Sequence, residues 1–295
     1  MINSDRFSNQ SQAFYFPVSD QPLTMKAGLN EFGTDFGNEQ DQNFLQFDCK
    51  AKEYKKVKLE CNPNRHWATG TCTEHFKLHS QVIHFICKKL NNELGIQPDS
   101  SFLSICNKLQ NEEQVDNVEL NLTYISLSLL FQEDFAILAD SPNPSLIMGN
   151  ITMPSFWSPE KIRESDFDDI HKPVPNFPKT LRGSEKMATL IASKGPFVRF
   201  VWTVTNDNRL DHHPDKGKNS WVLNQPLWLR VERQVSVPFN GLGALFLIRT
   251  YLYPMEKLND SQKCTLRTAV ESMPEDVARY KGLWDAKKII SENIE

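Results

Sequence analysis

Apolar residues recur with a helical period in the first third of this 295-residue chain. Between residues 73 and 94 they return every three or four positions. Gly95 follows at once, so this segment is predicted to be an amphipathic helix that ends at the glycine. The apolar stripe of this helix consists of Phe76, Ile83, Ile86 and Leu90. Shorter helices are predicted at 48–58 and 100–109.

Strand patterns dominate from residue 127 onward. Stretches rich in apolar and β-branched residues, bounded by turn-forming residues, predict strands at 127–138, 146–153, 197–205, 227–237 and 244–253. The sequence Asn240-Gly-Leu-Gly243 predicts a hairpin between the last two strands. A helical pattern lies between 171 and 197, and another begins at 261. Adjacent antiparallel strands with helices set apart from them predict an α+β fold.

The ends and the overall charge limit the class of protein. Residues 1–42 are rich in Asn, Gln, Ser, Asp and Gly, and we expect them to form an irregular lead-in around one domain at 43–295. The net charge is −4, so no bulk attraction to nucleic acid or to an anionic membrane is expected. We find neither a membrane-spanning apolar run nor a signal-peptide pattern, which predicts a cytoplasmic protein. The six cysteines are then expected to be free thiols.

One histidine stands in a segment stiffened by proline, Ile170-His-Lys-Pro-Val-Pro175. Each proline fixes its own φ and pushes the residue before it towards an extended conformation. We therefore expect His171 to lie on a rigid, non-helical segment. Histidine is a common metal ligand and a frequent proximal haem ligand, and the alternative is a structural histidine that bonds a carbonyl group. As a ligand, its second ring nitrogen should donate to a carbonyl or to a carboxylate such as Asp168 or Asp169.

Polar residues alternate along the strand predicted at 227–237. Because neighbouring strand residues point to opposite faces, one face is predicted to carry Arg230, Glu232 and Gln234. The other face is predicted to carry Val231 and Arg233. If Val231 faces the core, the polar trio faces solvent or a cavity, and burying it requires partners or a ligand. Arg249, on the next strand, is expected to lie close enough to join the trio. The alternative is a solvated sheet face with cross-strand ion pairs.

Other chemistry-bearing residues give weaker signals. Glu133 and Asp134 are adjacent on a predicted strand, so only one of them can face a pocket and they are not a catalytic pair. A protein would recognise a cationic amine through a carboxylate or through the face of an aromatic ring. Weaker candidates for metal ligands are His75, His79, His212 and His213. The chain has no dinucleotide-binding or P-loop motif and no cysteine pattern of an iron–sulfur cluster.

Several blocks together make a specific family resemblance. They are Phe131-Gln-Glu-Asp134, Met153-Pro-Ser-Phe-Trp157, the segment around His171, Trp228-Leu-Arg-Val-Glu-Arg-Gln234 and Leu245-Phe-Leu-Ile-Arg-Thr-Tyr251. Through these blocks the chain resembles the alpha-subunit-like family of haem-dependent oxidative N-demethylases, from about Asn43 to about Leu283. One departure is Arg199-Phe-Val-Trp202, where the family leads us to expect Asn in place of Val201.

The resemblance implies a PAS-like antiparallel sheet with flanking helices and helical extensions at both ends of the domain. It also implies haem b, with His171 as the proximal ligand of the iron. The other residues assigned to the cofactor are Arg230, Arg233 and Arg249, which would pair with haem propionates, and Trp157. Residues assigned to the substrate are Glu133, Asp134 and Glu232.

The implied activity is oxidative N-demethylation of a small secondary amine with oxygen, releasing formaldehyde. Electrons would come from an external reductase with flavin and iron–sulfur centres, because this chain has no motif for either group or for a nicotinamide nucleotide. One alternative is a non-catalytic PAS-type sensor of haem or of a small ligand. The other is a haem-free interaction protein.

Overall fold

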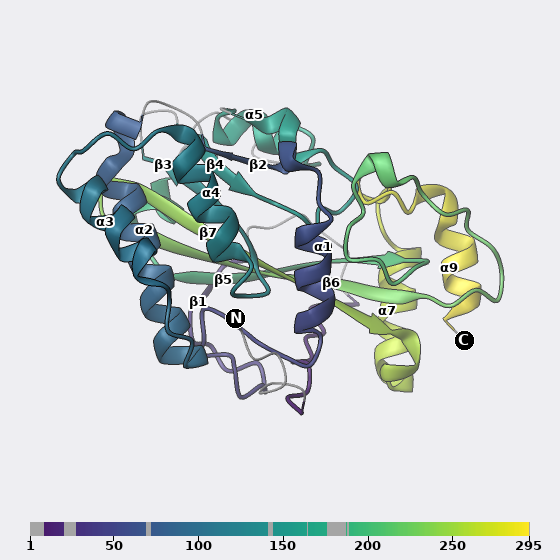
Figure 1. Ribbon diagram of the computed structural model, residues 1–295. Helices are drawn as coiled ribbons and strands as arrows, with labels where there is room; N and C mark the ends of the chain where they lie inside the picture. Colours follow the sequence, from purple (N-terminus) through teal and green to yellow (C-terminus); the bar gives the residue numbers. More distant parts are fainter. Residues whose placement is uncertain are drawn as a thin grey trace.

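An antiparallel sheet forms the centre of the protein (Figure 1). The computed structural model describes residues 9–20, 28–68, 72–140, 144–163, 165–175, 187 and 189–294. Within these residues the sheet has seven strands, in the order β1 (Asn30–Glu31), β5 (Phe197–Thr205), β6 (Trp228–Phe239), β7 (Gly243–Pro254), β3 (Asp134–Ala139), β4 (Ser145–Asn150) and β2 (His66–Ala68). Every neighbouring pair is antiparallel, which confirms the predicted α+β class.

The two longest strands, β6 and β7, form a hairpin at the middle of the sheet. Gly241 in the connecting turn has φ 69°, which an L side chain rarely adopts. At Gly243 a Cβ atom would collide with the carbonyl oxygen of Leu138 on β3, so only glycine fits there. The hairpin predicted at 240–243 is confirmed. The positive φ of Gly241 and the close approach of β3 to Gly243 explain why both positions are glycine.

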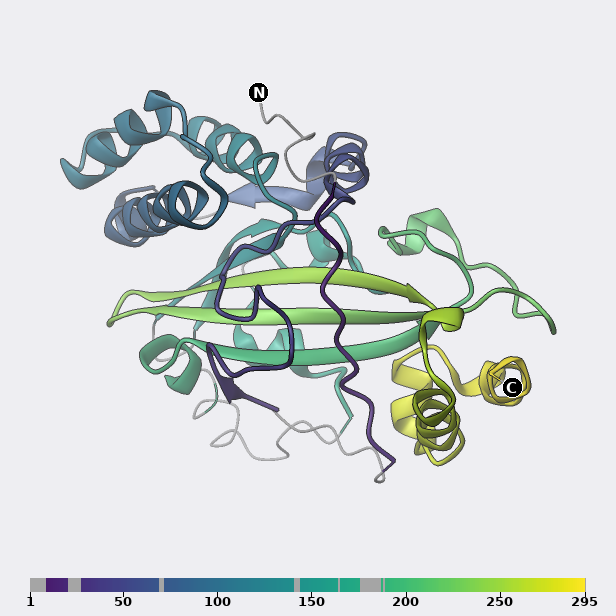
Figure 2. The same cartoon turned by 90° about the horizontal axis from the view of Figure 1, so that it is seen from below.

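One face of the sheet is covered by helices, and we call it the helix face. It carries Val198, Val235 and Leu247. At one end it is packed by α2 (Cys72–Leu94), α3 (Ser100–Gln110) and α4 (Asn117–Ser128). At the other end, Val231 and Tyr253 pack against α7 (Asp260–Glu271), α8 (Glu275–Tyr280) and α9 (Lys287–Asn293). Figure 2 shows the two groups of helices at opposite ends of the long strands.

Caps fix where the helices begin and end. The side chain of Asp99 accepts from the backbone N–H of Ser101 (2.8 Å) and starts α3. The side chain of Asp116 accepts from the N–H of Glu119 (2.8 Å) and starts α4. Gly95, with φ 61°, donates its N–H to Asn91 (2.9 Å) and ends α2. The helices predicted at 73–94 and 100–109 are confirmed, as is the helix predicted at 48–58, which is α1 (Ala51–Leu59).

The described part of the lead-in lies against the sheet. The Tyr15 ring lies 4.7 Å from that of Phe200 and 5.4 Å from that of Tyr251, centroid to centroid. Further on, β1 pairs with β5 at the edge of the sheet through Asn30 and Val198. In the described residues 9–20 and 28–42, β1 is the only regular element.

One predicted strand was wrong in its bounds. The strand predicted at 127–138 begins only at Asp134, because α4 extends to Ser128 and buries Leu120, Tyr124 and Leu127 at helical spacing. A short apolar run does not distinguish a strand from a buried helical turn. The helical pattern predicted between 171 and 197 is confirmed where the structure describes it, because residues 187 and 189–193 are helical. His171 itself is the last residue of the helix α5 (Phe167–His171), and 176–186 and 188 lie outside the described residues.

Candidate functional site

A cleft of about 170 Å³ lies on the other face of the sheet, which we call the cleft face. Its floor comes from β3, β5, β6 and β7, and its walls come from β4, from residues 151–171 and from Ile191. Most of the lining is apolar, including Leu138, Phe167 and Ile248. The polar side chains that reach it are His171, Arg199, Gln234 and Ser236. Trp157 lines the cleft and is half-buried, as expected for a pocket wall.

His171 reaches the cleft from the end of α5. Asp166 starts this helix by accepting from the N–H of Asp169 (2.8 Å). The Nδ1–H of His171 donates to the carbonyl oxygen of Phe167 (2.8 Å). A carbonyl can only accept, so Nδ1 carries the proton and Nε2 carries the lone pair of the neutral ring. Burial lowers the pKa of His171, and the positive charge of Arg199 lowers it further, which favours this neutral form.

The ring of His171 is therefore oriented by a carbonyl group, which the sequence analysis predicted for a ligand and also for the alternative of a structural histidine. The expectation of a non-helical segment was wrong, because α5 begins ahead of the prolines and ends at His171 itself. The acceptor is the carbonyl of Phe167 rather than the carboxylate of Asp168 or Asp169. A helical turn supplies this acceptor four residues before the histidine. A neutral imidazole whose other nitrogen is hydrogen-bonded is the usual state of a metal-ligating histidine.

Arg199 is the cation of the cleft, and the sequence analysis did not assign it to the site. It lies on β5 directly opposite Gln234 on β6, and both side chains line the cleft. Its Nε is shielded from solvent and has no hydrogen-bond partner in the described structure. Burial lowers the pKa of Arg199, and the nearby carboxylate of Glu232 opposes that shift. Arg199 was visible in the sequence only as a charged residue within an apolar strand.

The polar trio of β6 shares the cleft face, as predicted, but only Gln234 reaches the cleft. The other face carries Val231, which is fully buried in the core as the prediction required. The carboxylate of Glu232 accepts from Ser155 (2.6 Å) and from Gln234 (3.0 Å). This chain of contacts links the polar end of the cleft to the segment that carries Trp157.

Arg230 joins two loops beneath the cleft instead of lining it. Its guanidinium donates to the carbonyls of Met153 (2.7 Å) and Leu210 (2.9 Å) and to the hydroxyl of Ser155 (2.6 Å). These acceptors belong to the segment before Trp157 and to the polar loop after β5. The alternative of a solvated face is wrong at this position, because Arg230 is only 1% exposed.

The structure brings Arg233 and Arg249 to the helix face, away from the cleft. Arg249 forms an ion pair with Asp48 (2.6 Å) and lies 4.0 Å from the ring centroid of Tyr54. Arg233 donates to the backbone carbonyl of Asn43 (2.8 Å). The expectation that Arg249 joins the polar trio was wrong, because its direct cross-strand partner is Arg233 and direct partners share a face.

Glu133 and Asp134 are both buried, and both have internal donors. Asp134 accepts from the N–H groups of Thr152 (2.8 Å) and Met153 (2.7 Å). Glu133 accepts from the N–H of Gln46 (2.8 Å), and burial raises its pKa. Neither residue lines the cleft, so the structure does not bring these carboxylates to His171.

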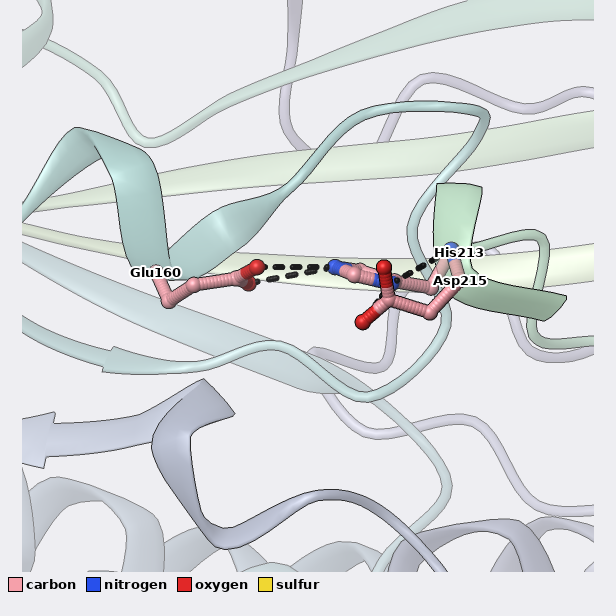
Figure 3. Close-up of side chains that lie close together, drawn as sticks. All are labelled: Glu160, His213 and Asp215. Carbon is pink, nitrogen blue, oxygen red and sulfur yellow. Dashed lines mark hydrogen bonds and ion pairs between the residues drawn. The ribbon is translucent and has the colours of Figure 1, made fainter.

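Figure 3 shows a cluster of Glu160, His213 and Asp215 with metal-ligand side chains. The Nδ1 of His213 accepts from the backbone N–H of Asp215 (3.1 Å), so its Nε2 carries the proton and donates to Glu160 (3.0 Å). Both ring nitrogens are thus used within the protein, and Asp215 lies largely in solvent, with 73% of its side chain exposed. This arrangement caps the short turn at Pro214–Lys216 and orients no lone pair of the ring towards an ion.

His212 is likewise structural rather than a loop residue in solvent. It is 1% exposed, its Nε2 lies 2.7 Å from a carboxylate oxygen of Asp207, and its ring stacks on Phe156 at 4.6 Å between centroids. Burial and the positive charge of Arg230 lower the pKa of His212 to about 4. The pair His212-His213 therefore fixes the loop after β5 against the segment before Trp157.

A comparison with known protein families shows which family the chain belongs to. Residues 52–291 match the family described as haem-dependent oxidative N-demethylase, alpha subunit-like. The chain belongs to this family. The family name indicates dependence on haem and an alpha subunit, which is consistent with partner subunits. No curated protein matches the chain. No helix in the described part of this family member is both long and apolar enough to cross a bilayer.

Proposed function

We propose that this chain binds haem b in the cleft, that His171 would be a ligand of the iron, and that the chain oxidatively N-demethylates a small secondary amine. The observation that carries the proposal is His171 itself. It lines an apolar cleft, its Nδ1–H is held by the Phe167 carbonyl, and its neutral ring leaves the lone pair on Nε2. We also propose a PAS-like architecture for the sheet and its helices, as the family resemblance implies.

The donor set of the cleft fits haem. Its apolar walls suit a macrocycle, and the imidazole of His171 suits iron. The Nε of Arg199 is buried without a partner in the described structure, so the cleft also has a donor for an anionic group. Haem supplies oxygen binding and electron transfer when it is bound. The protein would position and orient the bound molecule. The apolar side chains beside His171 exclude water from that end of the cleft.

The overall reaction sets what the chain needs from outside. A secondary N-methyl amine, oxygen, two electrons and two protons give the demethylated amine, formaldehyde and water. The sequence holds no nicotinamide, flavin or iron–sulfur motif. We therefore propose an external reductase with flavin and iron–sulfur centres as the electron donor, and a cytoplasmic location. Glu232, close to the polar end of the cleft, stays a proposed contact for a cationic amine.

The size of the cleft favours a second candidate, a PAS-type sensor of a small ligand. A volume of about 170 Å³ is close to that of an engineered cavity of about 150 Å³ that binds benzene. Val201 stands where the family leads us to expect Asn, and it lies on β5 two residues from Arg199. A sensor would bind its ligand without turning it over.

Reconstitution with hemin tests the proposal. The wild-type chain should develop a Soret band. His171→Ala should lose the band or recover it only with added imidazole, whereas His84→Ala, at an exposed position of α2, should behave as wild type. With a chemical reductant in excess, which supplies both electrons, the protein should then release formaldehyde from dimethylamine in air. An unchanged spectrum in His171→Ala refutes the ligand assignment, and oxygen binding without formaldehyde favours the sensor.

A further inference from the structure

Two polar atoms at the floor of the cleft lack partners in the described structure. They are the Nε of Arg199 on β5 and the hydroxyl oxygen of Ser236 on β6, and both are shielded from solvent. Both residues line the cleft, and Ser236 is only 4% exposed. Arg199 lies opposite Gln234, and Ser236 is the next residue of β6 on the same face. A buried polar atom without a hydrogen bond is costly, so two adjacent ones at one cleft point to a ligand.

The other buried arginines differ from Arg199 in that each guanidinium has at least one acceptor in the described structure, although the Nε of Arg65 and the Nε and Nη1 of Arg249 also lack partners. Arg249 pairs with Asp48, Arg233 donates to backbone carbonyls, and Arg230 donates to Met153, Leu210 and Ser155. The side chain of Arg199 has no hydrogen bond or ion pair to another residue of the described chain. Glu232 is a nearby carboxylate, and its oxygens already accept from Ser155 and Gln234.

We propose that Arg199 and Ser236 form a subsite that binds a carboxylate group of the molecule held in the cleft. The inference rests on the proposed function only in taking the cleft as the binding site. A guanidinium and a hydroxyl supply N–H and O–H donors to the oxygens of one carboxylate. A monoanion balances the single charge of Arg199. A phosphate dianion would leave an excess negative charge near Glu232.

Two sources supply this chemistry, a propionate of a porphyrin and the carboxylate of an amino-acid-like amine. Both combine an anionic group with an apolar or amine-bearing body, which suits a cleft that has donors at Arg199 and Ser236 and a mostly apolar lining. The subsite would fix the orientation of either molecule, because each carboxylate can be placed only at this end of the cleft.

The first arm of the test uses metal-free protoporphyrin IX and its dimethyl ester, followed by fluorescence. Neither probe needs an iron ligand, so the result stands even if His171→Ala shows that His171 does not bind iron. The wild type should prefer the free acid over the ester by roughly tenfold or more, as a charge-assisted hydrogen bond allows. Arg199→Met should lose most of that preference, and Ser236→Ala should lose part of it.

The second arm compares binding of N-methylglycine and dimethylamine to the same variants by calorimetry. A preference for N-methylglycine that disappears in Arg199→Met assigns the subsite to the substrate instead. The matched control is Arg163→Met. Arg163 is exposed, follows the cleft-wall residue Ile162 in the chain, and donates to the carbonyl of Asn64. This variant should keep both preferences.

Folding is checked separately, because a misfolded variant would mimic a lost subsite. Arg199→Lys keeps a cation in place and should retain part of the acid preference if Arg199→Met proves unstable. The subsite is overturned if wild type prefers neither the free acid nor N-methylglycine, or if each preference persists unchanged in Arg199→Met and Arg199→Lys.

Discussion

Arg233 on β6 and Arg249 on β7 are direct cross-strand partners, and both guanidinium groups are buried on the helix face. Two adjacent cations in the core require separate acceptors. Arg249 has the carboxylate of Asp48 at 2.6 Å, and Arg233 has the carbonyl of Asn43 at 2.8 Å. Both acceptors come from the segment that precedes α1. These arginines thus attach the segment before α1 to the middle of the sheet, while the cleft lies on the opposite face.

Arg249→Met should lower the free energy of unfolding by about 3–5 kcal/mol, because it leaves the carboxylate of Asp48 buried without its cation. Porphyrin affinity of the folded fraction should not change. Chemical denaturation and porphyrin titration measure the two effects. The control is Arg279→Met, which removes an exposed i,i+4 pair with Glu275 and should have little effect. Normal stability with lost porphyrin binding would contradict the structural role.

Arg199→Met should have the opposite outcome for stability. Since Arg199 has no internal acceptor in the described structure, its removal should leave the free energy of unfolding unchanged or higher. Thermal unfolding of the ligand-free protein measures this directly. A loss as large as that of Arg249→Met would show that Arg199 has a structural partner.

Lys58 is a buried cation near the end of α1, and its side chain reaches the end of α4. Its Nζ donates to the carbonyls of Ser128 (2.9 Å) and Phe131 (3.0 Å), and burial lowers its pKa to about 8. Lys58→Met should cost about 2–3 kcal/mol of stability, since it leaves buried carbonyls without donors. Urea unfolding measures the loss. Lys56→Met on the same helix, at a position that is 72% exposed, should stay within about 0.5 kcal/mol of wild type.

Acid should destabilise the protein through three buried histidines. Burial lowers the pKa of His66 to about 4, of His79 to about 3 and of His212 to about 4. Below the unfolded-state pKa of about 6.5 the unfolded chain binds more protons than the folded chain, so stability falls as the pH falls from about 6.5 towards about 4. Above about pH 6.5 these histidines are neutral in both states, so they add no pH dependence to the free energy of unfolding.

Unfolding free energies measured between about pH 7 and about pH 5 test this slope. His79→Gln keeps a polar group for the hydroxyl of Tyr124, which lies 2.8 Å from the histidine, but it does not titrate. It should reduce the slope by up to about 1.4 kcal/mol per pH unit. His84→Gln, at an exposed position on the same helix, should keep the wild-type slope. An equal slope in all three proteins would show that His79 titrates normally.

The local sequence determined the elements whose pattern is self-contained. The stripe of α2 with Gly95 at its end, the three long strands and the glycine-bearing hairpin follow from periodicity and backbone limits, which act over a few residues. The motif blocks were sufficient for the family, which the match over residues 52–291 confirms. The alternation along β6 also predicted correctly that Gln234 and Val231 face opposite sides.

Only the tertiary structure decided which of these residues meet. Periodicity could not separate the end of α4 from a strand, because an apolar run suits both when it is buried. It could not give the strand order, which sends Arg249 to the side opposite the cleft and places Arg199 beside Gln234. Residues 171, 199 and 236 come from α5, β5 and β6, and the fold brings them to one cleft. Such contacts between distant segments depend on how the whole chain folds, and no local pattern encodes them.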